Sequence, residues 1–358
     1  MTQKRDSRSS RSAPVSGGAA RATIKDVAAE AGVSVAAVSK VVRNAYGVSD
    51  EMRTKVQAAI DKLGYRPNVG ARTMRGRSYT VGVKATELSS LFVSEVVESI
   101  GEEFHGTPFD VILTATGPDP VQQQRSIEVL LDRQIDGLIV VAPWVSPAWL
   151  EQVAERVPTV VVAQHGLAKD YDTVVNDDAE GARMVVEHLV GLGHRRIAHT
   201  GQPVGSDSAH PLSHVARQKG YEDAMRSHGL EPDVIVTSYS EHGGYEAARE
   251  ALARPEPPTA IFAGADVAAL GAMRAIEDAG LSVPGDISLV GYDNIWISAI
   301  KRISLTTVDQ SSRITGAASA RLLLERMQGE RTQSVRYTVA PSLIVRGTTA
   351  PPRLSADA

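Results

Sequence analysis

From Thr80 onward the sequence alternates short apolar runs with longer amphipathic segments, and this alternation constrains the fold more than any other feature. The apolar runs are rich in Val, Ile and Ala, and the segments between them repeat apolar residues at helical spacing. This pattern predicts βαβ units, with parallel sheets that helices cover on both faces. The expected strands are 80–85, 110–115, 137–142, 159–163, 196–201, 233–238, 260–265 and 287–293. The expected helices are 93–103, 122–133, 178–191, 216–228, 243–253 and 266–279.

The length of this α/β body predicts two lobes. It spans about 270 residues, which is too many for one such sheet core. Two doubly wound lobes with a cleft between them fit better, because open parallel sheets bind ligands beyond the carboxyl ends of their strands. We expect the first lobe to comprise about 80–176 and 308–334, the second about 177–307 and 335–350, and a tail over 351–358.

Charge divides the chain into a basic head and an acidic body. Residues 1–80 carry a net charge of +9 and the remaining residues a net charge of −13. A basic head on an acidic body suggests that the head meets a polyanion such as nucleic acid. A merely sticky basic tail is the alternative, because several of the cations precede Ile24.

Composition excludes several classes of protein. The chain contains no cysteine, which excludes a disulfide scaffold, cysteine-ligated zinc and thiol catalysis. The longest stretch without a charge, 137–150, is shorter than the roughly 20 residues of a membrane helix. Residues 1–22 are basic and rich in Ser, Gly and Ala, without an apolar run. They predict a disordered tail rather than a secretory signal, and hence a cytoplasmic protein.

Residues 23–66 show three short helical patterns. Thr23 and Asp26 have the spacing of a capping box at the start of the first helix, and Gly32 is expected to end that helix. Ser34 is expected to cap the second helix and Ser49 the third. Two short helices joined by a glycine turn indicate a helix-turn-helix within a small all-α head.

The second of these helices, 34–42, is predicted to have one exposed and one buried face. At about 100° per residue, Val35, Ala36, Ser39, Lys40 and Arg43 share an arc of about 140°. Apolar residues fill the opposite arc. A slim face with cations at its end fits a DNA major groove, where small side chains let the backbone approach the bases. A three-helix domain that binds protein would show the same generic pattern, so the residues alone leave both alternatives open.

Long motifs in this chain resemble those of the lactose-repressor (LacI/GalR) family of bacterial transcription regulators. The resemblance begins with TIKDVAAEAGVSVAAVSKVVRN in the head and extends through RPNVGARTMRGRS to residue 78. It continues in the body with GHRRIA (193–198), ARQKGYEDAM (216–225), ALGAMRAIEDAGLSVPGDISLVGYDN (269–294), LTTVDQ (305–310) and VRGTTAPP (345–352). The motifs are long, occur in order and span residues 23 to about 352.

The resemblance implies a homodimer that reads a near-palindromic operator. Thr23 at the start of the head is included among the expected DNA-binding residues, and Ser34 and Asn44 match contacts to the DNA backbone. Val35 and Ala36 match the pair that selects bases. Ser39 and Lys40 match further contact positions. Because Val35 and Ala36 are apolar, we expect readout of thymine methyl groups and DNA shape.

The resemblance also implies a hinge helix over 67–75, within a linker that runs to residue 79. A helix this short is unstable alone, so we expect it to fold on operator DNA against its dimer mate. Met74 matches an apolar residue that wedges between base pairs and bends the duplex. Asn68, Ala71 and Arg72 match the residues around the wedge. The chain ends PPRLSADA without a leucine heptad, which favours a dimer over a tetramer held by a tail zipper.

For the body, the resemblance implies a fold like that of periplasmic sugar-binding proteins, with a small effector between the lobes. Arg217 matches an arginine that grips effector hydroxyls, and Asp293 matches an acid that accepts from them. Tyr239 matches a stacking position. The chain departs from the usual family residues at Gln164, Ala265 and the sequence GYDN, so the expected effector is an unusual sugar, a sugar acid or a non-sugar. The expected effector residues are Ser90, Phe92, Gln164, Arg217, Tyr239, Ala265, Asp266 and Asp293.

Motifs for catalysis or cofactor binding are not evident. The sequence has no G-x-S-x-G elbow, Walker loop or dinucleotide fingerprint after the first strand, so neither an enzyme nor a cofactor is predicted. His210 and His214 have a metal-like spacing, but Pro211 lies between them and no metal site is predicted. Asp177 and Asp178 are interpreted as caps of the helix that follows rather than as a catalytic pair.

The sequence therefore predicts an operator-binding repressor that a small effector relieves. Three alternative functions remain: a regulator whose effector acts as corepressor or activator, a cytoplasmic sugar-binding protein, and a sugar-modifying enzyme. The mechanism expected for the regulator is reciprocal linkage, in which the effector favours the lobe arrangement that pulls the paired hinges apart.

Overall fold

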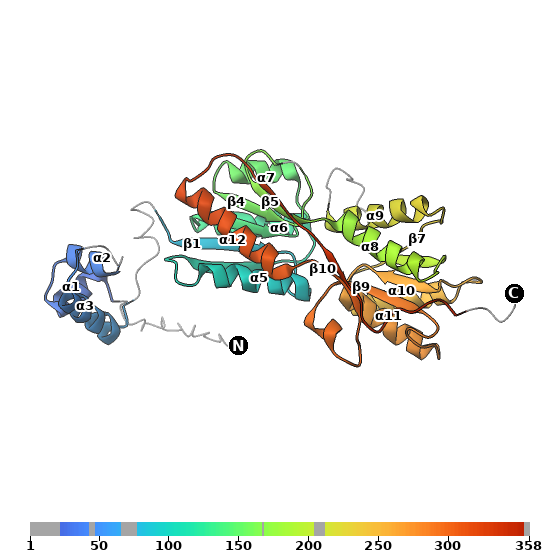
Figure 1. Cartoon of the computed structure of the whole chain (residues 1–358). Helices are drawn as coiled ribbons and strands as arrows, with labels where there is room; N and C mark the ends of the chain where they lie inside the picture. Colours follow the sequence, from blue (N-terminus) through green and yellow to red (C-terminus); the bar gives the residue numbers. More distant parts are fainter. Residues whose placement is uncertain (1–21, 43–46, 66–76, 167, 204–211, 354–358) are drawn as a thin grey trace, which may run out of the picture. The chain divides into compact units, whose positions relative to one another are not determined.

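The computed structural model describes residues 22–42, 47–65, 77–166, 168–203 and 212–353. The chain divides into two compact units, Met1–Ser78 and Tyr79–Ala358, which Figure 1 shows in colours that follow the sequence.

The first unit contains the three predicted helices. They are α1 (Ile24–Ala31), α2 (Val35–Val42) and α3 (Asp50–Leu63). Val27, Val38 and Val56, one from each helix, are fully buried in a common core. Gly32 and Gly64 end α1 and α3 with positive φ angles of 63° and 57°, a conformation that glycine adopts without a steric penalty.

The second unit contains two six-stranded sheets, which confirms the predicted two-lobed α/β body. The first sheet has the strand order β11-β5-β4-β3-β1-β2 and is wholly parallel. The second has the order β12-β10-β9-β8-β6-β7, in which only the edge strand β12 is antiparallel. The strands of the first sheet are β1 (Thr80–Ala85), β2 (Asp110–Ala115), β3 (Gly137–Val141), β4 (Thr159–Val162), β5 (Asp172–Asn176) and β11 (Arg336–Val339). Those of the second are β6 (Ile197–Gly201), β7 (Asp233–Val236), β8 (Ala260–Ala263), β9 (Ser288–Asp293), β10 (Thr306–Asp309) and β12 (Ser342–Ile344).

Helices cover both faces of each sheet. In the first lobe, α5 and α12 pack on one face, and α6 and α7 on the other. In the second lobe, α8 and α9 share a core with one face, and α10 and α11 with the other. The bounds are α5 (Leu91–Phe104), α6 (Pro120–Asp132), α7 (Pro147–Ala154), α8 (Asp178–Gly191), α9 (Ser213–Ser227), α10 (Glu241–Leu252), α11 (Asp266–Asp278), the 3₁₀ helix η1 (Trp296–Ala299) and α12 (Ser312–Gln328).

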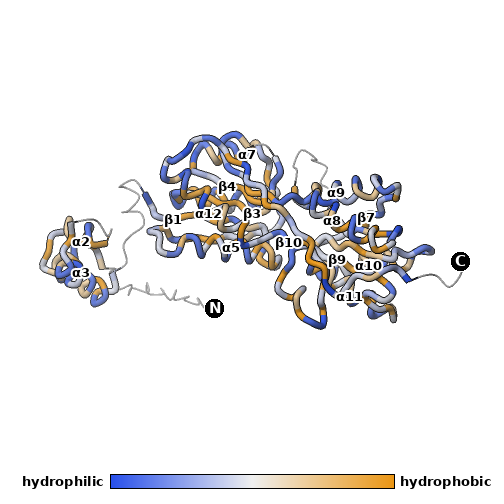
Figure 2. Tube along the Cα trace, viewed as in Figure 1, coloured by the Kyte–Doolittle hydropathy of each residue, from blue (hydrophilic) through white to orange (hydrophobic). Residues whose placement is uncertain are grey.

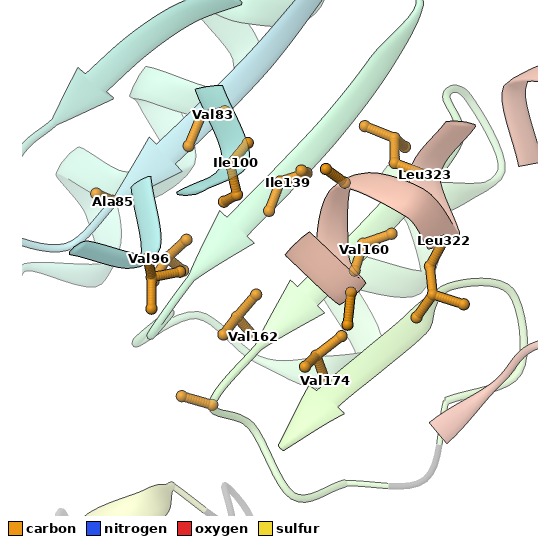
Figure 3. Packing of buried hydrophobic residues seen from close by; sticks show 14 of the residues in the cluster. Val83, Ala85, Val96, Ile100, Ile139, Val160, Val162, Val174, Leu322 and Leu323 are labelled. Carbon is orange, nitrogen blue, oxygen red and sulfur yellow. The ribbon is translucent and has the colours of Figure 1, made fainter. Parts of the chain in front are cut away.

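Continuous apolar strands form the centre of each lobe. In Figure 3, Val83, Ile139 and Val160 from adjacent strands face Ile100 of α5 and Leu323 of α12. Figure 2 shows hydrophobic colour along the strands and hydrophilic colour at many loops. All residues of β3 and β4 are buried, because helices cover both faces of these central strands.

The chain passes between the two sheets three times, after β5, after β10 and after β11. Residues 335–350 were expected to lie in the second lobe, but this is wrong for β11, which pairs with β5 in the first sheet. The run RYTV of β11 is mostly exposed and lacks an apolar pattern, so the sequence carries little sign of its partner. The third passage therefore lies between Val339 and Ser342.

The described residues contain neither a membrane-spanning helix nor a cluster of metal-ligating side chains. Within those ranges, no helix is both long enough and apolar enough to cross a membrane. Nor do three or more His, Asp or Glu side chains come together there as they would around a metal ion.

Candidate functional site

The start of α1 has the predicted capping box. The Thr23 backbone N–H donates to the Asp26 carboxylate at 2.7 Å, and the Asp26 N–H donates back to Thr23 Oγ1 at 3.4 Å. The hydrogen bonds from the Thr23 backbone and side chain lower the pKa of Asp26. This exchange fixes the first turn of α1 and holds Thr23 at its start.

Helix α2 presents most of the predicted face to solvent. Ser34 caps the helix by accepting from the Ala37 N–H at 3.1 Å. Val35 is 38% exposed, and Ala36 and Lys40 are exposed as well. These residues form a slim surface that ends in a cation, as a major-groove helix requires.

Ser39 does not belong to this exposed face. Its side chain was expected beside Lys40, but Ser39 is only 6% exposed. Both α1 and α3 pack on the short helix α2, so the buried arc around Val38 is wide enough to include Ser39. Five other expected DNA-binding residues lie outside the described residues: Asn44, Asn68, Ala71, Arg72 and Met74.

A cleft of about 630 Å³ lies beyond the carboxyl ends of strands from both lobes of the body. Thr86, Ala142 and Ala163 line it directly after β1, β3 and β4 of the first sheet. Asp293 lies at the end of β9 in the second sheet, so both sheets contribute strand ends to one site. The structure brings six of the expected effector residues together here: Ser90, Phe92, Arg217, Tyr239, Ala265 and Asp293.

Two expected effector residues are not part of the cleft lining. Gln164 is fully buried, donates to the Val145 carbonyl at 3.3 Å and accepts from the Tyr171 hydroxyl at 3.4 Å. Asp266 is also fully buried, and its carboxylate accepts from Ser298 Oγ at 2.7 Å and Thr307 Oγ1 at 2.6 Å. Burial raises the pKa of Asp266 to about 6. Both side chains are therefore occupied by structural hydrogen bonds.

Arg217 of α9 is 4% exposed and held on three sides. Its Nη2 donates to Asp178 Oδ1 at 2.7 Å, and its Nη1 donates to the Gly264 carbonyl. The guanidinium carbon lies 3.6 Å from the centre of the Tyr292 ring, a cation–π arrangement. The buried Nε–H has no hydrogen-bond partner in the described part of the chain.

Asp178 begins α8, but it does not cap the helix in the way expected. Asp177 does so, accepting from the Glu180 N–H at 3.1 Å. Asp178 instead pairs with Arg217 and accepts at Oδ2 from His165 Nε2 at 2.9 Å. Burial alone would raise the pKa of Asp178, but the Arg217 charge and the His165 hydrogen bond hold it below its ordinary value. Asp178 is therefore ionised at neutral pH.

Asp293 has the opposite titration behaviour. It has a φ of 119°, which is unusual for a residue other than glycine, and it accepts at Oδ1 from Gln310 Nε2. Burial raises the pKa of Asp293 well above its ordinary value, against the opposing effect of Arg217. Arg217 is thus paired with a buried, ionised carboxylate, whereas Asp293 in the cleft lining favours its protonated form.

Sequence reasoning missed several cleft residues. Trp144 and His214 face each other from different lobes, with ring centres 5.9 Å apart and planes 25° apart. Burial lowers the pKa of His214 to about 4, so its ring is neutral. Trp144 follows the end of β3, and the strand-end argument could have found it. His214 was considered only for its spacing from His210, which lies outside the described residues.

Comparison with known proteins agrees with this architecture. A family described as "Bacterial regulatory proteins, lacI family" matches residues 23–68, and a "Periplasmic binding protein-like domain" matches residues 186–349. The HTH-type transcriptional regulator DegA of Bacillus subtilis (strain 168) is 33% identical over 339 residues, covering 92% of this chain and 99% of that protein.

Solved structures show the same similarity over both units. The lac repressor dimer bound to operator and the anti-inducer ONPF is 30% identical with a TM-score of 0.78, covering 92% of this chain and 99% of that one. The transcriptional regulator CelR in complex with cellobiose is 30% identical with a TM-score of 0.67, covering 92% of this chain and all of that one. On these findings, the chain belongs to the lacI family of bacterial regulatory proteins.

Proposed function

We propose that this protein binds operator DNA as a homodimer and represses transcription until a small carbohydrate effector occupies the cleft of its body. The observation that carries the proposal is the combination, in one chain, of a helix-turn-helix whose second helix has an exposed face and a two-lobed body with a cleft at the strand ends of both lobes. The lac repressor dimer bound to operator and CelR bound to cellobiose, both similar over 92% of this chain, support the two halves of the proposal.

In the head, Val35, Ala36 and Lys40 are the residues proposed to meet DNA. Two small apolar side chains suit thymine methyl groups, and the Lys40 ammonium suits a phosphate or a guanine edge. The hinge residues Asn68, Arg72 and Met74 join the proposal on family resemblance alone, with Met74 as an apolar wedge in the minor groove.

Exposed apolar side chains on the body support dimerisation. The strand β2 forms an edge of the first sheet and exposes Val111 by 37% and Leu113 by 40%. In the second lobe, Trp296 is 64% exposed and Ile300 is 41% exposed. An exposed apolar sheet edge favours association with another chain.

The cleft is proposed to bind its ligand without changing it. Glycoside hydrolysis needs two carboxyl groups free to act on the bond between sugar units. Both oxygens of Asp178 are occupied, one by Arg217 and one by His165, so Asp178 is unsuited to act as a nucleophile. This pairing of Asp178, together with the similarity of the chain to transcriptional regulators, favours a sensor over a sugar-modifying enzyme.

The experiment begins with selection of a binding site from random duplex DNA by the purified full-length protein. We expect a near-palindromic site, bound with an affinity that falls steeply as salt concentration rises. Lys40→Ala should weaken binding to that site, whereas Lys25→Ala, which changes a cation at the start of α1, serves as the matched control. Enrichment of no site would contradict operator recognition.

The sign of the effector response distinguishes an inducer from a corepressor, the two modes of regulation that the sequence leaves open. Carbohydrates are added to the protein–operator complex, and dissociation is followed by fluorescence anisotropy. Release of the operator by a sugar identifies an inducer, and tightening identifies a corepressor. Loss of the response in Arg217→Gln, with operator binding retained, would place the sugar in the cleft.

A further inference from the structure

We propose that the cleft selects uncharged, hydroxyl-rich effectors and rejects acidic or phosphorylated ones, because Asp178 already neutralises Arg217 inside the protein. This inference rests on the proposed function, in which the cleft holds the effector. It narrows the possible ligands, which on sequence alone include sugar acids.

Most of the hydrogen-bond donors of Arg217 are already occupied, so little of its positive charge is available to an incoming ligand. An arginine that grips a carboxylate or phosphate normally presents two parallel N–H donors to it. Here Nη2 donates to Asp178 and Nη1 donates to the Gly264 carbonyl. Nε–H is left without a partner among the described residues. A single N–H beside a paired carboxylate suits a hydroxyl oxygen better than an anion.

Asp178 is fixed in place from the side opposite Arg217. Arg336 Nη2 lies 3.5 Å from His165 Nδ1, and because an arginine can only donate, Nδ1 is the accepting nitrogen. His165 Nε2 therefore carries the proton and donates to Asp178 Oδ2 at 2.9 Å. Asp178 also lies in the first turn of α8, where the helix dipole stabilises a negative charge. An anionic ligand would have to compete with this fully buried carboxylate.

The rest of the described lining does not compensate an anion. Arg217 is the single Lys or Arg among the lining residues that the structure describes, whereas Glu87 and Glu241 contribute carboxylates, of which Glu241 pairs with Arg274 at 2.8 Å. An anion that entered would lose its hydration and approach the carboxylate of Glu87 and the buried carboxylate of Asp178.

The unpartnered polar atoms of the lining instead match hydroxyl groups. The buried Arg217 Nε, Tyr239 Oη and His214 Nε2 have no hydrogen-bond partner among the residues that the structure describes. The first can only donate, the second can donate or accept, and the role of the third depends on its tautomer. A ligand with several hydroxyls can serve all three, because each hydroxyl both donates and accepts.

The test measures anion binding by the full-length protein, with D-glucuronate and inorganic phosphate as probes in isothermal titration calorimetry at constant ionic strength. We expect no saturable binding of either probe at millimolar concentration by the wild type. Asp178→Asn keeps the shape of the side chain but releases the Arg217 charge, so binding of at least one probe should tighten by about tenfold or more. Asp178→Asn combined with Arg217→Gln should lose that gain.

Glu246→Gln is the matched control, because it removes one carboxylate of an exposed ion pair in the same lobe. Its anion binding should equal that of the wild type. Two results would overturn the inference: saturable wild-type binding of a probe that Arg217→Gln abolishes, or equal anion binding by Asp178→Asn and the wild type. If Asp178→Asn fails to fold, the comparison of wild type with Arg217→Gln decides alone. Operator binding is measured separately, so its failure would refute the proposed function without altering this test.

Discussion

The ion pair between Arg217 and Asp178 allows a stability prediction that needs no knowledge of the effector. The two groups are 2.7 Å apart, with side chains 5% and 0% exposed. Removing one partner of a buried pair leaves an unpaired charge in the interior and costs about 3–5 kcal/mol. We therefore expect Arg217→Met and Asp178→Asn each to lower the free energy of unfolding of the body by an amount of this order.

Replacing both partners together should cost much less than the sum of the two single changes. Neither charge is then left unpaired, and a neutral pair of similar volume can be nearly as stable as the ion pair. A body of this size shifts its unfolding midpoint by about 2–4 °C for each kcal/mol, so each single variant should melt roughly 6–20 °C below the wild type.

Tryptophan fluorescence follows this unfolding selectively, because Trp144, Trp149 and Trp296 all lie in the body. Glu246→Gln breaks the exposed Arg249–Glu246 pair and should cost less than about 1 kcal/mol. If either single variant lost less than about 1 kcal/mol, or if the double variant lost the sum of both, the paired charges would not be coupled as described.

Three further predictions concern the dimer, the operator and the head. Leu113→Lys places a charge on the exposed edge strand β2, so it should weaken dimerisation by about tenfold or more in sedimentation velocity. Val236→Lys, on the edge strand β7, should leave dimerisation unchanged, and equal effects of the two variants would contradict a β2 interface. Replacing operator thymines by deoxyuridine removes the methyl groups that are proposed to contact Val35 and Ala36. Loss of each contacted methyl should weaken operator binding by about 0.8 kcal/mol in anisotropy titrations, and unchanged affinity would refute methyl readout. Thr23→Ala removes the side-chain cap of α1 and should destabilise the head by about 1 kcal/mol in thermal unfolding followed by circular dichroism, with Thr23→Ser close to the wild type.

The sequence was informative where elements are long or continuously apolar. The expected helix over 178–191 has the observed bounds of α8, and the expected strands over 80–85 and 110–115 have the bounds of β1 and β2. The strands β5, β10, β11 and β12 were not predicted, because each has three to five residues and most include polar side chains. Helix α12 was missed for another reason. It is buried on several sides by small residues, so its sequence has no apolar stripe with helical spacing.

The candidate site was predictable where it depends on strand ends and less so where it depends on pairing across the fold. Arg217, Tyr239 and Asp293 were expected in the cleft and line it. The pairing of Arg217 with Asp178 was not predicted, because Asp178 lies 39 residues earlier in the chain. Its position at the start of a helix had been interpreted as capping. Asp266 was placed wrongly because its neighbour Ala265 does line the cleft, and adjacent residues at the start of α11 point in different directions.

Asp293 leads to a final prediction, about the pH dependence of stability. Its pKa is raised in the folded protein, chiefly by burial, so the fold favours the protonated carboxyl over the ionised one. The resulting stabilisation is present below the ordinary pKa of an aspartate and is lost as the pH rises through the folded value. Asp178 has the opposite sign, because its pKa is lowered, and its stabilisation is lost as the pH falls through its folded value.

Asp293→Asn should therefore flatten the loss of stability above the ordinary carboxyl pKa and leave the body at least as stable as the wild type at neutral pH. The asparagine oxygen can still accept from Gln310 Nε2, and the facing groups Asp266, Asp178 and Arg217 remain. Urea unfolding of the body, followed by tryptophan fluorescence from acid to neutral pH, measures the two slopes. Asp178→Asn should flatten the acid limb instead. If Asp293→Asn destabilised the body at neutral pH as much as at acid pH, the ionised form of Asp293 would be no less stable in the fold than the protonated form, and a raised pKa for this carboxyl would be wrong.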